Sequence, residues 1–318
     1  MRNKIVAIQG NKLSKLNPTT DTSIFLAKEA QKIGLKLFYY EPQYLSIVNN
    51  KVIAKGNFVK FTNNKKFYKI LDNKLLDLST VKYILIRQDP PFNLEYITTT
   101  YILDNLNKVK IINNPSAIRN ISEKLYSTKF MKYLPRTIFS SNIKQIKKFL
   151  KLNKKIIIKP IHGYSGNNIK LLKGKLNKKE IVNYLNKHGH IMCQKFLPLI
   201  KFGDKRVFII NGKVVGAISR VPKKGSFLSN LSKGASAKLI KLTKKELSIS
   251  KIVAKDLKQN NIYFAGIDFI SGKLNGDINV TSPTGLKTFF DLSGINLAEV
   301  FWNNLKWQKN SQLNKKVH

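Results

Sequence analysis

Two aspartates near residue 270 are unusual because acidic residues are scarce in this sequence. The chain has 17 Asp and Glu against 58 Lys and Arg, yet Asp268 lies within the apolar run YFAGIDFI and Asp277 comes two positions before Asn279. Side chains two positions apart on a strand project from the same face. Two carboxylates and an amide oxygen that converge form a hard oxygen site suited to Mg²⁺ carrying phosphates. The alternative is that Asp268 caps a turn and Asp277 is solvated.

Arginines offer a second kind of chemistry on a predicted hairpin. Asp204 and Arg206 lie on one strand face in GDKRVF, and Arg220 lies on the adjacent strand in ISRVP. Guanidinium groups on paired strands can clamp a phosphate or a carboxylate through fork-like hydrogen bonds. The alternative is a cross-strand pair with Asp204, which stabilises a fold little when it is exposed.

A lysine and a glycine-bearing loop are candidates for phosphate contacts. Lys159 ends the predicted buried strand KKIIIKP, where a compact charge can reach a phosphate. Gly163 and Gly166 follow in HGYSGNN and permit close approach of a backbone to phosphate. A solvated lysine and an ordinary hairpin are the alternatives, and the spacing is not that of a P-loop. The turn TSPTG supplies hydroxyl and backbone N–H groups just past the metal candidates, at Ser282, Thr284 and Gly285.

No credible nucleophile accompanies these groups. Cys193 is the only cysteine, and its place in the predicted strand HIMCQKFLP indicates a buried, inert thiol. The histidines form no metal pattern, and no Ser–His–Asp or Cys–His arrangement can be assigned. A single cysteine also excludes an intrachain disulfide and fits a reducing compartment.

Strands and helices alternate along the N-terminal part of the chain and must position its polar groups. The strands read KIVAIQ, LKLFYY, VKYILIRQDPPF and KVKIINNP, and the helices read SIFLAKEAQKI, capped by Asp21 and stopped by Gly34, and NLEYITTTYILDNL. This alternation predicts a parallel α/β sheet. Ligands bind beyond the carboxyl ends of such strands, which places Gln9, Gly10 and the corner at Arg87 near a site.

After about residue 120 the pattern changes to an α+β arrangement. The first lobe is predicted from the helices SEKLYSTKFMKYL and NIKQIKKFLKL, the strand KKIIIKP, the hairpin IHGYSGNNIKLL, a helix near 177–186 and the strand HIMCQKFLP. The second lobe begins with a hairpin that turns at Asn211 and Gly212. It continues with the helix KKELSISKIVAKDLKQN, the strands NIYFAGIDFI and GDINV, and a helix near 296–304.

Composition limits the class of protein. A length of 318 residues with 42% hydrophobic residues supports two or three packed lobes. No apolar run approaches the ~20 residues of a membrane span, and the first apolar stretch is too short for a signal peptide, so we expect a cytoplasmic protein without membrane contact. The net charge of +41 suggests nucleic-acid binding as a separate hypothesis. The lysines are spread along the whole chain, however, which disfavours a nucleic-acid partner.

Together these segments resemble the bacterial glutathione synthetases of the ATP-grasp superfamily. The matching segments are IRQDPPF, NNPSAIRNISEKL, IIKP, GDKRVF, SRVP, GIDFI and INVTSPTGL. RQDPPF together with INVTSPTG distinguishes this family from most other ATP-grasp ligases. The resemblance implies an N-terminal parallel α/β (pre-ATP-grasp) domain over 1–120, a two-lobed α+β ATP-grasp domain over 121–310 with lobes of about 121–200 and 201–310, and a tail at 311–318.

The resemblance also implies an activity: ATP-dependent joining of γ-glutamylcysteine to glycine through an acylphosphate, with Mg²⁺ or Mn²⁺ as the metal. It implies that Lys124 and Lys159 hold ATP phosphates beneath a mobile loop from Gly163 to Gly166. It implies an adenine hinge at Gln194, Lys195, Phe196 and Leu197, and metal ligands at Asp268, Asp277 and Asn279. It implies that Arg206 and Arg220 contact the transferred phosphoryl group or the substrate carboxylate. It implies that Arg87, Asp21 and Ser23 contact the dipeptide.

Three places depart from the family's pattern. Asp277 stands where the family usually has Glu, with Gly276 as an extra residue before it; the phosphate loop lacks its leading Asp; and Leu228 stands where an arginine is usual. These departures keep two alternatives open, namely a diverged ATP-grasp ligase with another acceptor and an inactive nucleotide-binding relative. The resemblance is also compatible with a homotetramer.

Overall fold

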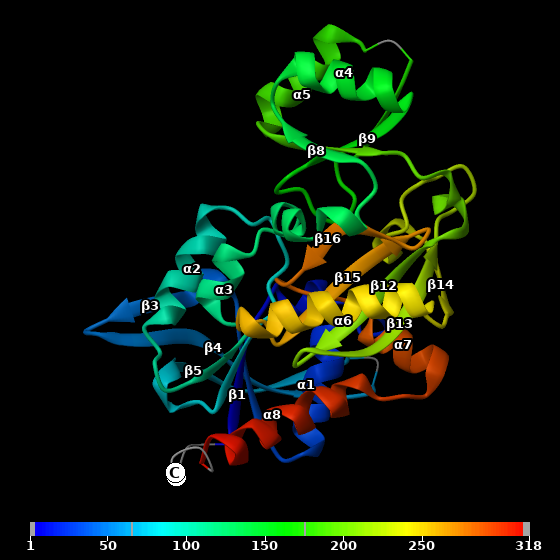
Figure 1. The fold of residues 1–318 in the computed structure, drawn as a ribbon. Helices are drawn as coiled ribbons and strands as arrows, with labels where there is room; N and C mark the ends of the chain where they lie inside the picture. Colours follow the sequence, from blue (N-terminus) through cyan, green and yellow to red (C-terminus); the bar gives the residue numbers. More distant parts are fainter. Residues whose placement is uncertain (1–3, 65, 175, 314–318) are drawn as a thin grey trace.

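The computed structural model describes residues 4–64, 66–174 and 176–313 (Figure 1). Its strands form three sheets of seven, four and five strands. The helices α4 and α5 lie with the four-stranded sheet in a lobe that stands apart at the top of Figure 1, above the other two sheets. None of the helices in the described residues is both long and apolar enough to span a membrane.

The seven-stranded sheet contains the predicted parallel strands. These are β1 (Ile5–Gln9), β2 (Lys36–Tyr40), β6 (Tyr83–Ile86) and β7 (Lys110–Ile112). Helix α1 (Thr22–Lys32) lies between β1 and β2, α2 (Leu94–Asp104) lies between β6 and β7, and the short α3 (Pro115–Asn120) follows β7. As predicted, Asp21 caps α1, because its carboxylate accepts a hydrogen bond of 2.9 Å from the backbone N–H of Ile24.

Three antiparallel strands extend this sheet, and the alternation of strands and helices did not predict them. They are β3 (Leu45–Val48), β4 (Lys51–Phe61) and β5 (Tyr68–Asp77), and the sheet is therefore mixed. β4 pairs with β2 and β3 along one side and with β5 along the other. Buried and exposed side chains largely alternate along β4, which is the period expected of a strand with one covered face.

The four-stranded sheet is antiparallel and is covered by two amphipathic helices. Its strands are β8 (Thr137–Ser140), β9 (Lys155–Pro160), β10 (Lys170–Lys173) and β11 (Ile191–Lys195), and its helices are α4 (Ile143–Asn153) and α5 (Lys178–His188). β9 and β10 form the predicted glycine-bearing hairpin. The segment Leu125–Tyr133, expected as an α-helix, is instead a 3₁₀ helix with a kink at Phe130.

The five-stranded sheet is antiparallel throughout and carries most of the acidic and arginine candidates. Its strands are β12 (Asp204–Ile210), β13 (Lys213–Val221), β14 (Ser236–Leu239), β15 (Phe264–Ile270) and β16 (Lys273–Asn279). The long helix α6 (Lys244–Gln259) begins with a capping box between Thr243 and Glu246. Between β15 and β16 the register shifts around Asp268, so that the segment from Asn275 to Asp277 bulges opposite it.

The chain returns to the first sheet at its C-terminal end. After α7 (Leu286–Ser293), helix α8 (Leu297–Leu313) lies beside α1 in Figure 1, and the indole N–H of Trp302 donates to the carbonyl oxygen of Leu26 at 2.9 Å. Phe301 and Trp302 pack in the same core as Val6 and Ile8 of β1. Residues 311–313 of the expected tail belong to α8, and 314–318 lie outside the described residues.

A single asparagine links the first sheet to the third. The side-chain amide of Asn113 donates to the carbonyl oxygens of Phe264 and Val280 at 2.7 and 2.6 Å. Its oxygen accepts from the backbone N–H groups of Tyr263 and Phe264 at 2.9 and 2.8 Å. This buried group uses every hydrogen bond available to it, and it fixes the start of β15 and the end of β16 against the N-terminal sheet.

Candidate functional site

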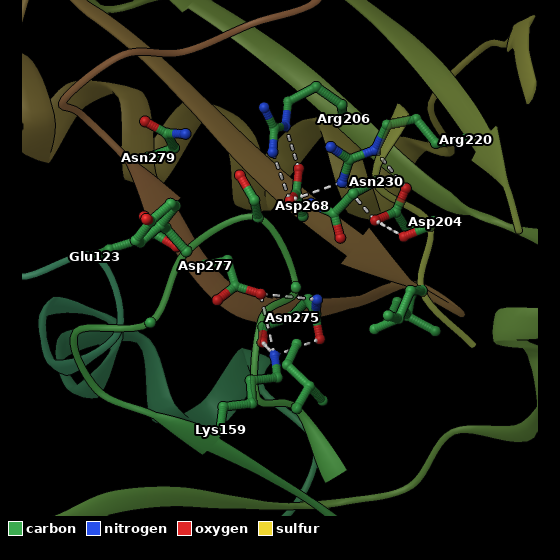
Figure 2. A pocket seen from close by; sticks show the side chains of 18 of the residues that line it. Glu123, Lys159, Asp204, Arg206, Arg220, Asn230, Asp268, Asn275, Asp277 and Asn279 are labelled. Carbon is green, nitrogen blue, oxygen red and sulfur yellow. Dashed lines mark hydrogen bonds and ion pairs between the residues drawn. The ribbon is translucent and has the colours of Figure 1, made fainter. Parts of the chain in front are cut away.

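One cavity of about 340 Å³ collects most of the predicted site residues. Its walls come from the loop after β9, the end of β11, and strands β12, β13, β15 and β16. The predicted residues in its lining are Lys124, Lys159, Gly163, Gly166, Gln194, Lys195, Phe196, Leu197, Arg206, Arg220, Asp268, Asp277, Asn279, Ser282, Thr284 and Gly285. Figure 2 shows that their charged side chains form two groups, one around Asp268 and one around Asp277.

The first group is a buried chain of arginines and aspartates across three neighbouring strands. Arg206 on β12 donates to Asp268 on β15 through Nε and Nη2, with Nη2 at 2.9 Å from Oδ2. Arg220 on β13 binds Asp204 through Nε at 2.8 Å and reaches Asp268 through Nη2 at 2.8 Å. The cross-strand pair with Asp204 therefore forms, but it is buried and shares Arg220 with Asp268.

Charge balance in this group keeps Asp268 ionised. Burial alone would raise the pKa of Asp268, but the guanidinium groups of Arg206 and Arg220 outweigh burial and hold that pKa at about 2. Two buried guanidinium groups facing one shared carboxylate leave this wall rich in hydrogen-bond donors. It suits an anion such as a phosphate or a carboxylate.

A depressed folded-state pKa has a consequence for acid stability. The pKa of Asp268 falls from 3.8 to about 2 on folding, so its ionisation stabilises the fold above about pH 4. This contribution, on the order of 2 kcal/mol, is lost as the pH falls towards 2. We expect urea unfolding with a chelator present to show a smaller loss of stability between about pH 5 and about pH 3 for Asp268→Asn than for the parent. Equal losses would contradict the ionised, arginine-paired state.

The second group surrounds Asp277 with lysines. Lys159, at the end of β9, donates to Asp277 Oδ2 at 3.1 Å, and the ammonium of Lys124 lies 3.6 Å from Oδ1. Lys124 also donates to the carbonyl oxygen of Gly163 at 2.5 Å and to Glu123 at 3.2 Å. Burial acts to raise the pKa of Asp277, but the two lysines outweigh it and lower that pKa. Two almost fully buried ammonium groups at one carboxylate are positioned to hold further negative charge.

A divalent cation fits the oxygen atoms between the two groups. Asp268, Asp277 and Asn279 all line the cavity, and the side-chain oxygen of Asn279 is buried without a hydrogen-bond partner in the described part of the chain. A buried acceptor without a partner costs free energy unless a ligand satisfies it. No group of three or more His, Cys, Asp or Glu that could hold a metal occurs in the described residues, so the predicted ligand set depends on the amide oxygen of Asn279 as well as on the two carboxylates. Hard oxygen ligands of this kind suit Mg²⁺.

The predicted phosphate loop and hinge line the same cavity. Gly166 has φ of +72°, and a Cβ there would come within 2.7 Å of Asn230 Oδ1, so the close approach of this loop to Asn230 requires glycine. In the hinge, the backbone N–H groups of Lys195 and Phe196 donate to the carbonyl oxygens of Arg136 and Lys155 at 2.8 and 3.1 Å. These bonds fix the end of β11 and Phe196 where they line the cavity.

Three of the predicted substrate residues do not line the cavity but lie together next to it: Ser23 and Arg87 are buried, and Asp21 is half-buried. Arg87 Nε donates to Ser23 Oγ at 3.0 Å, and Nη2 donates to the carbonyl oxygen of Pro283 at 3.0 Å. Nη1 of Arg87 is buried without a partner in the described residues, and burial lowers the pKa of the guanidinium. The TSPTG turn therefore connects this cluster to the cavity.

Several lining residues were not among the predicted site residues. Asp204, Glu123, Asn275, Ser229, Asn230 and Asp89 all line the cavity. Two of them carried a signal: Asp204, as an acidic residue beside Arg206, was considered only as an ion-pair partner, and Asp89 belongs to the corner at Arg87 that was expected near a site. Leu228 lines the cavity at the position where an arginine was expected, whereas the nearby Lys224 and Lys233 are not among the lining residues.

The single cysteine takes no part in this cavity. Cys193 is fully buried in β11, and burial raises the pKa of its thiol to about 12. A thiol with that pKa is almost entirely protonated near neutral pH and is a poor nucleophile. The expected inert thiol is confirmed, and the groups that line the cavity can position and neutralise anions.

Comparisons with protein families match nearly the whole chain. Residues 5–119 match the family described as the N-terminal domain of prokaryotic glutathione synthetase, and residues 123–294 match the one described as its ATP-grasp domain. A glutathione synthetase of Agrobacterium fabrum is 31% identical over 97% of this chain and 98% of its own length. One from Buchnera aphidicola subsp. Baizongia pistaciae is 36% identical over 92% and 93%.

Solved structures with the same fold have much lower identity. The crystal structure of D-cycloserine synthetase DcsG aligns with a TM-score of 0.68 at 12% identity, covering 96% of this chain and 99% of that one. The ATP-grasp ligase PsnB, solved with a variant of its minimal precursor, Mg and ADP, aligns with a TM-score of 0.63 at 14% identity, covering 96% and 99%. At these identities the likeness establishes the fold.

Proposed function

This chain belongs to the prokaryotic glutathione synthetase family and is an ATP-dependent ligase that makes glutathione, and we propose that the cavity around Asp268 and Asp277 is its active site. The expectation from its motifs is thus confirmed for family, fold and reaction. One observation supports this assignment. The side chains of Arg206, Arg220, Lys124, Lys159, Asp268 and Asp277 line the same cavity as the unsatisfied amide oxygen of Asn279.

ATP would bind between the four-stranded and the five-stranded sheets. Lys124 and Lys159 would contact its phosphates, with the loop from Gly163 to Gly166 above them and the hinge from Gln194 to Leu197 at the base. Asp268, Asp277 and Asn279 would hold Mg²⁺, or Mn²⁺ in its place. When bound, the metal neutralises phosphate charge and polarises the phosphoryl group towards attack.

The reaction needs no nucleophile from the protein. A carboxylate oxygen of γ-glutamylcysteine attacks the γ-phosphorus of ATP, the bond to the ADP oxygen breaks, and an acylphosphate forms. The neutral amine of glycine then attacks the acyl carbon, phosphate leaves, and the nitrogen loses a proton. Arg206 and Arg220 would stabilise the transferred phosphoryl group or the substrate carboxylate, and Arg87, with Asp21 and Ser23, would orient the dipeptide near Ser282, Thr284 and Gly285. Positioning and charge neutralisation account for catalysis of this kind.

The departure at Asp277 is compatible with an active metal site. Gly276 has φ of +82°, and a Cβ there would collide with the side chain of Met192. The bulge opposite Asp268 accommodates the extra residue. It displaces the local backbone and leaves the packing of the core in place. Asp277 then reaches Lys159 and Lys124 inside the cavity, although it has one methylene fewer than glutamate.

A coupled assay of ADP release tests the proposed function. With γ-glutamylcysteine, glycine and Mg²⁺ all present, we expect ATP turnover, and omission of either amino substrate should reduce it to the background rate. Turnover with the dipeptide and a different amine would indicate a ligase with another acceptor. ATP binding without turnover under any combination would indicate an inactive nucleotide-binding relative, and both results would contradict the proposed function.

A further inference from the structure

One acid in the cavity wall, Asp204, has no part in the proposed reaction. It begins β12, is 2% exposed and lines the cavity with Arg220 and Asp268 (Figure 2). Asp268 is proposed to hold the metal, whereas no ligand is proposed for Asp204. A buried carboxylate costs free energy unless its partners compensate for it, so the partners of Asp204 indicate what it does.

The register of three strands places Asp204 directly opposite Arg220. Across β12 and β13, Asp204 pairs with Arg220, and across β12 and β15, Arg206 pairs with Asp268. Asp204 and Arg206 are two positions apart on β12, so both pairs project from the same face of the sheet. Arg220 therefore has one carboxylate on the neighbouring strand and a second one a strand further away.

All five N–H groups of Arg220 can be assigned. Nε donates to Asp204 Oδ1 at 2.8 Å, and Nη2 donates to Asp204 Oδ2 at 2.5 Å and to Asp268 Oδ2 at 2.8 Å. Nη1 has no hydrogen-bond partner within the described residues, yet it is not among the buried polar atoms that lack a partner. Its two N–H groups therefore face the cavity that Arg220 lines.

The contacts of Asp204 suit an ionised carboxylate. Its two oxygens accept the Nε and Nη2 groups of Arg220, and Oδ2 also accepts the hydroxyl of Ser229 at 2.5 Å. Burial raises the pKa of Asp204 above its ordinary value. The two N–H groups of the guanidinium, however, lie against both oxygens, and an ionised carboxylate is the acceptor that such a fork matches.

We propose that Asp204 is a positioning residue, which holds Arg220 by its Nε and Nη2 edge so that Nη1 faces the transferred phosphoryl group or the substrate carboxylate. This inference rests on the proposed function, because it needs Arg220 to act in that reaction. Without Asp204, the remaining carboxylate partner of Arg220 in the described residues is Asp268. The guanidinium group would then turn towards Asp268 and withdraw Nη1 from the cavity.

Asp204→Asn tests this role in the ADP-release assay with γ-glutamylcysteine, glycine and Mg²⁺. Asparagine keeps the size of the side chain but presents one acceptor and one NH₂ group, which repels the N–H groups of Arg220. We expect kcat to fall by about 10²-fold, because a donor aimed at the developing charge is displaced. The KM values for ATP and for glycine should stay within about threefold of the parental values, since ground-state binding is retained.

A double-mutant cycle shows whether Asp204 acts through Arg220. Arg220→Lys keeps the positive charge but loses the fork, so it should also lower kcat by about 10²-fold. Adding Asp204→Asn to Arg220→Lys should then lower kcat little further. Independent roles would instead give a combined loss of about 10⁴-fold.

The matched control is Asp104→Asn, because Asp104 also pairs with an arginine, Arg119, and neither residue lines the cavity. It should keep the parental kcat. Thermal melting checks that each variant is folded. If Asp204→Asn does not fold, Asp204→Glu keeps the charge but displaces the fork by one methylene, and its kcat should fall by about 10-fold or more.

Two results in an active parent would overturn this inference and leave the proposed function in place. One is a parental kcat in Asp204→Asn, or in Asp204→Glu where the asparagine variant does not fold. The other is a double variant in which the two losses multiply. A parent without turnover would contradict the proposed function itself, and with it the role of Arg220 that this inference needs.

Discussion

Replacing Asp268 with asparagine is expected to lower the rate of glutathione synthesis by about 10³-fold or more. The carboxylate lies on the cavity wall, is held by Arg206 and Arg220, and has a pKa of about 2, so it is fully charged under assay conditions. The substitution removes one of the proposed anionic metal ligands. It also leaves Arg206 without its carboxylate partner, whereas Arg220 keeps Asp204.

The measurement is ADP release at saturating Mg²⁺, with Asp291→Asn as the matched control because Asp291 is an exposed acid on α7 that pairs with Lys287. Thermal melting separates loss of chemistry from loss of fold. Asn279→Leu provides a second route, since it removes the unpaired oxygen and leaves the ion pairs in place. Parental activity in Asp268→Asn would remove this carboxylate from the metal site.

Replacing Lys159 with methionine is expected to reduce kcat/KM for ATP by about 10²-fold. Lys159 is almost completely buried, ends β9 and donates to both Asp277 and the carbonyl oxygen of Asn275. Methionine preserves much of the length and apolar surface of the side chain while removing the ammonium. Lys124 then remains as the only lysine paired with Asp277 in the described residues. A phosphate bound beside Asp277 would lose one of its two proposed lysine contacts.

Lys155→Met is the matched control, because Lys155 begins the same strand and its side chain is exposed. We expect Lys155→Met to keep parental kinetics, and the two variants to differ mainly in kcat/KM for ATP rather than in the KM for glycine. Equal kcat/KM values in the two variants would place the phosphate contact elsewhere in the cavity.

The sequence predicted those helices, strands and turns whose signals lie in neighbouring residues. Alternating strands and helices indicated the parallel strands of the first sheet, Asp21 capped its helix, and Asn211 with Gly212 closed the hairpin of β12 and β13. The pair β4 and β5 was missed because its lysines and asparagines resemble a polar loop. The alternating burial of β4 becomes visible only when the sheet covers one of its faces.

Prediction of the site depended on distances that local sequence does not contain. Asp268 and Asp277 could be placed on neighbouring strands, and the motifs brought Lys159 and Arg220 to the same cavity. The sequence did not indicate that Asp268 would be shared by two arginines, because that depends on the register of β12 against both β13 and β15. Nor did it indicate that Arg87 would be buried beside the cavity, since its partner Pro283 is distant in the chain.

The return of α8 to the first sheet has a consequence for synthesis on the ribosome. Phe301 and Trp302 complete the core that Val6 and Ile8 begin, so the N-terminal half emerges with one hydrophobic face uncovered. That face stays exposed until α8 has been translated. An uncovered apolar face of this kind makes the nascent chain prone to aggregation during that interval.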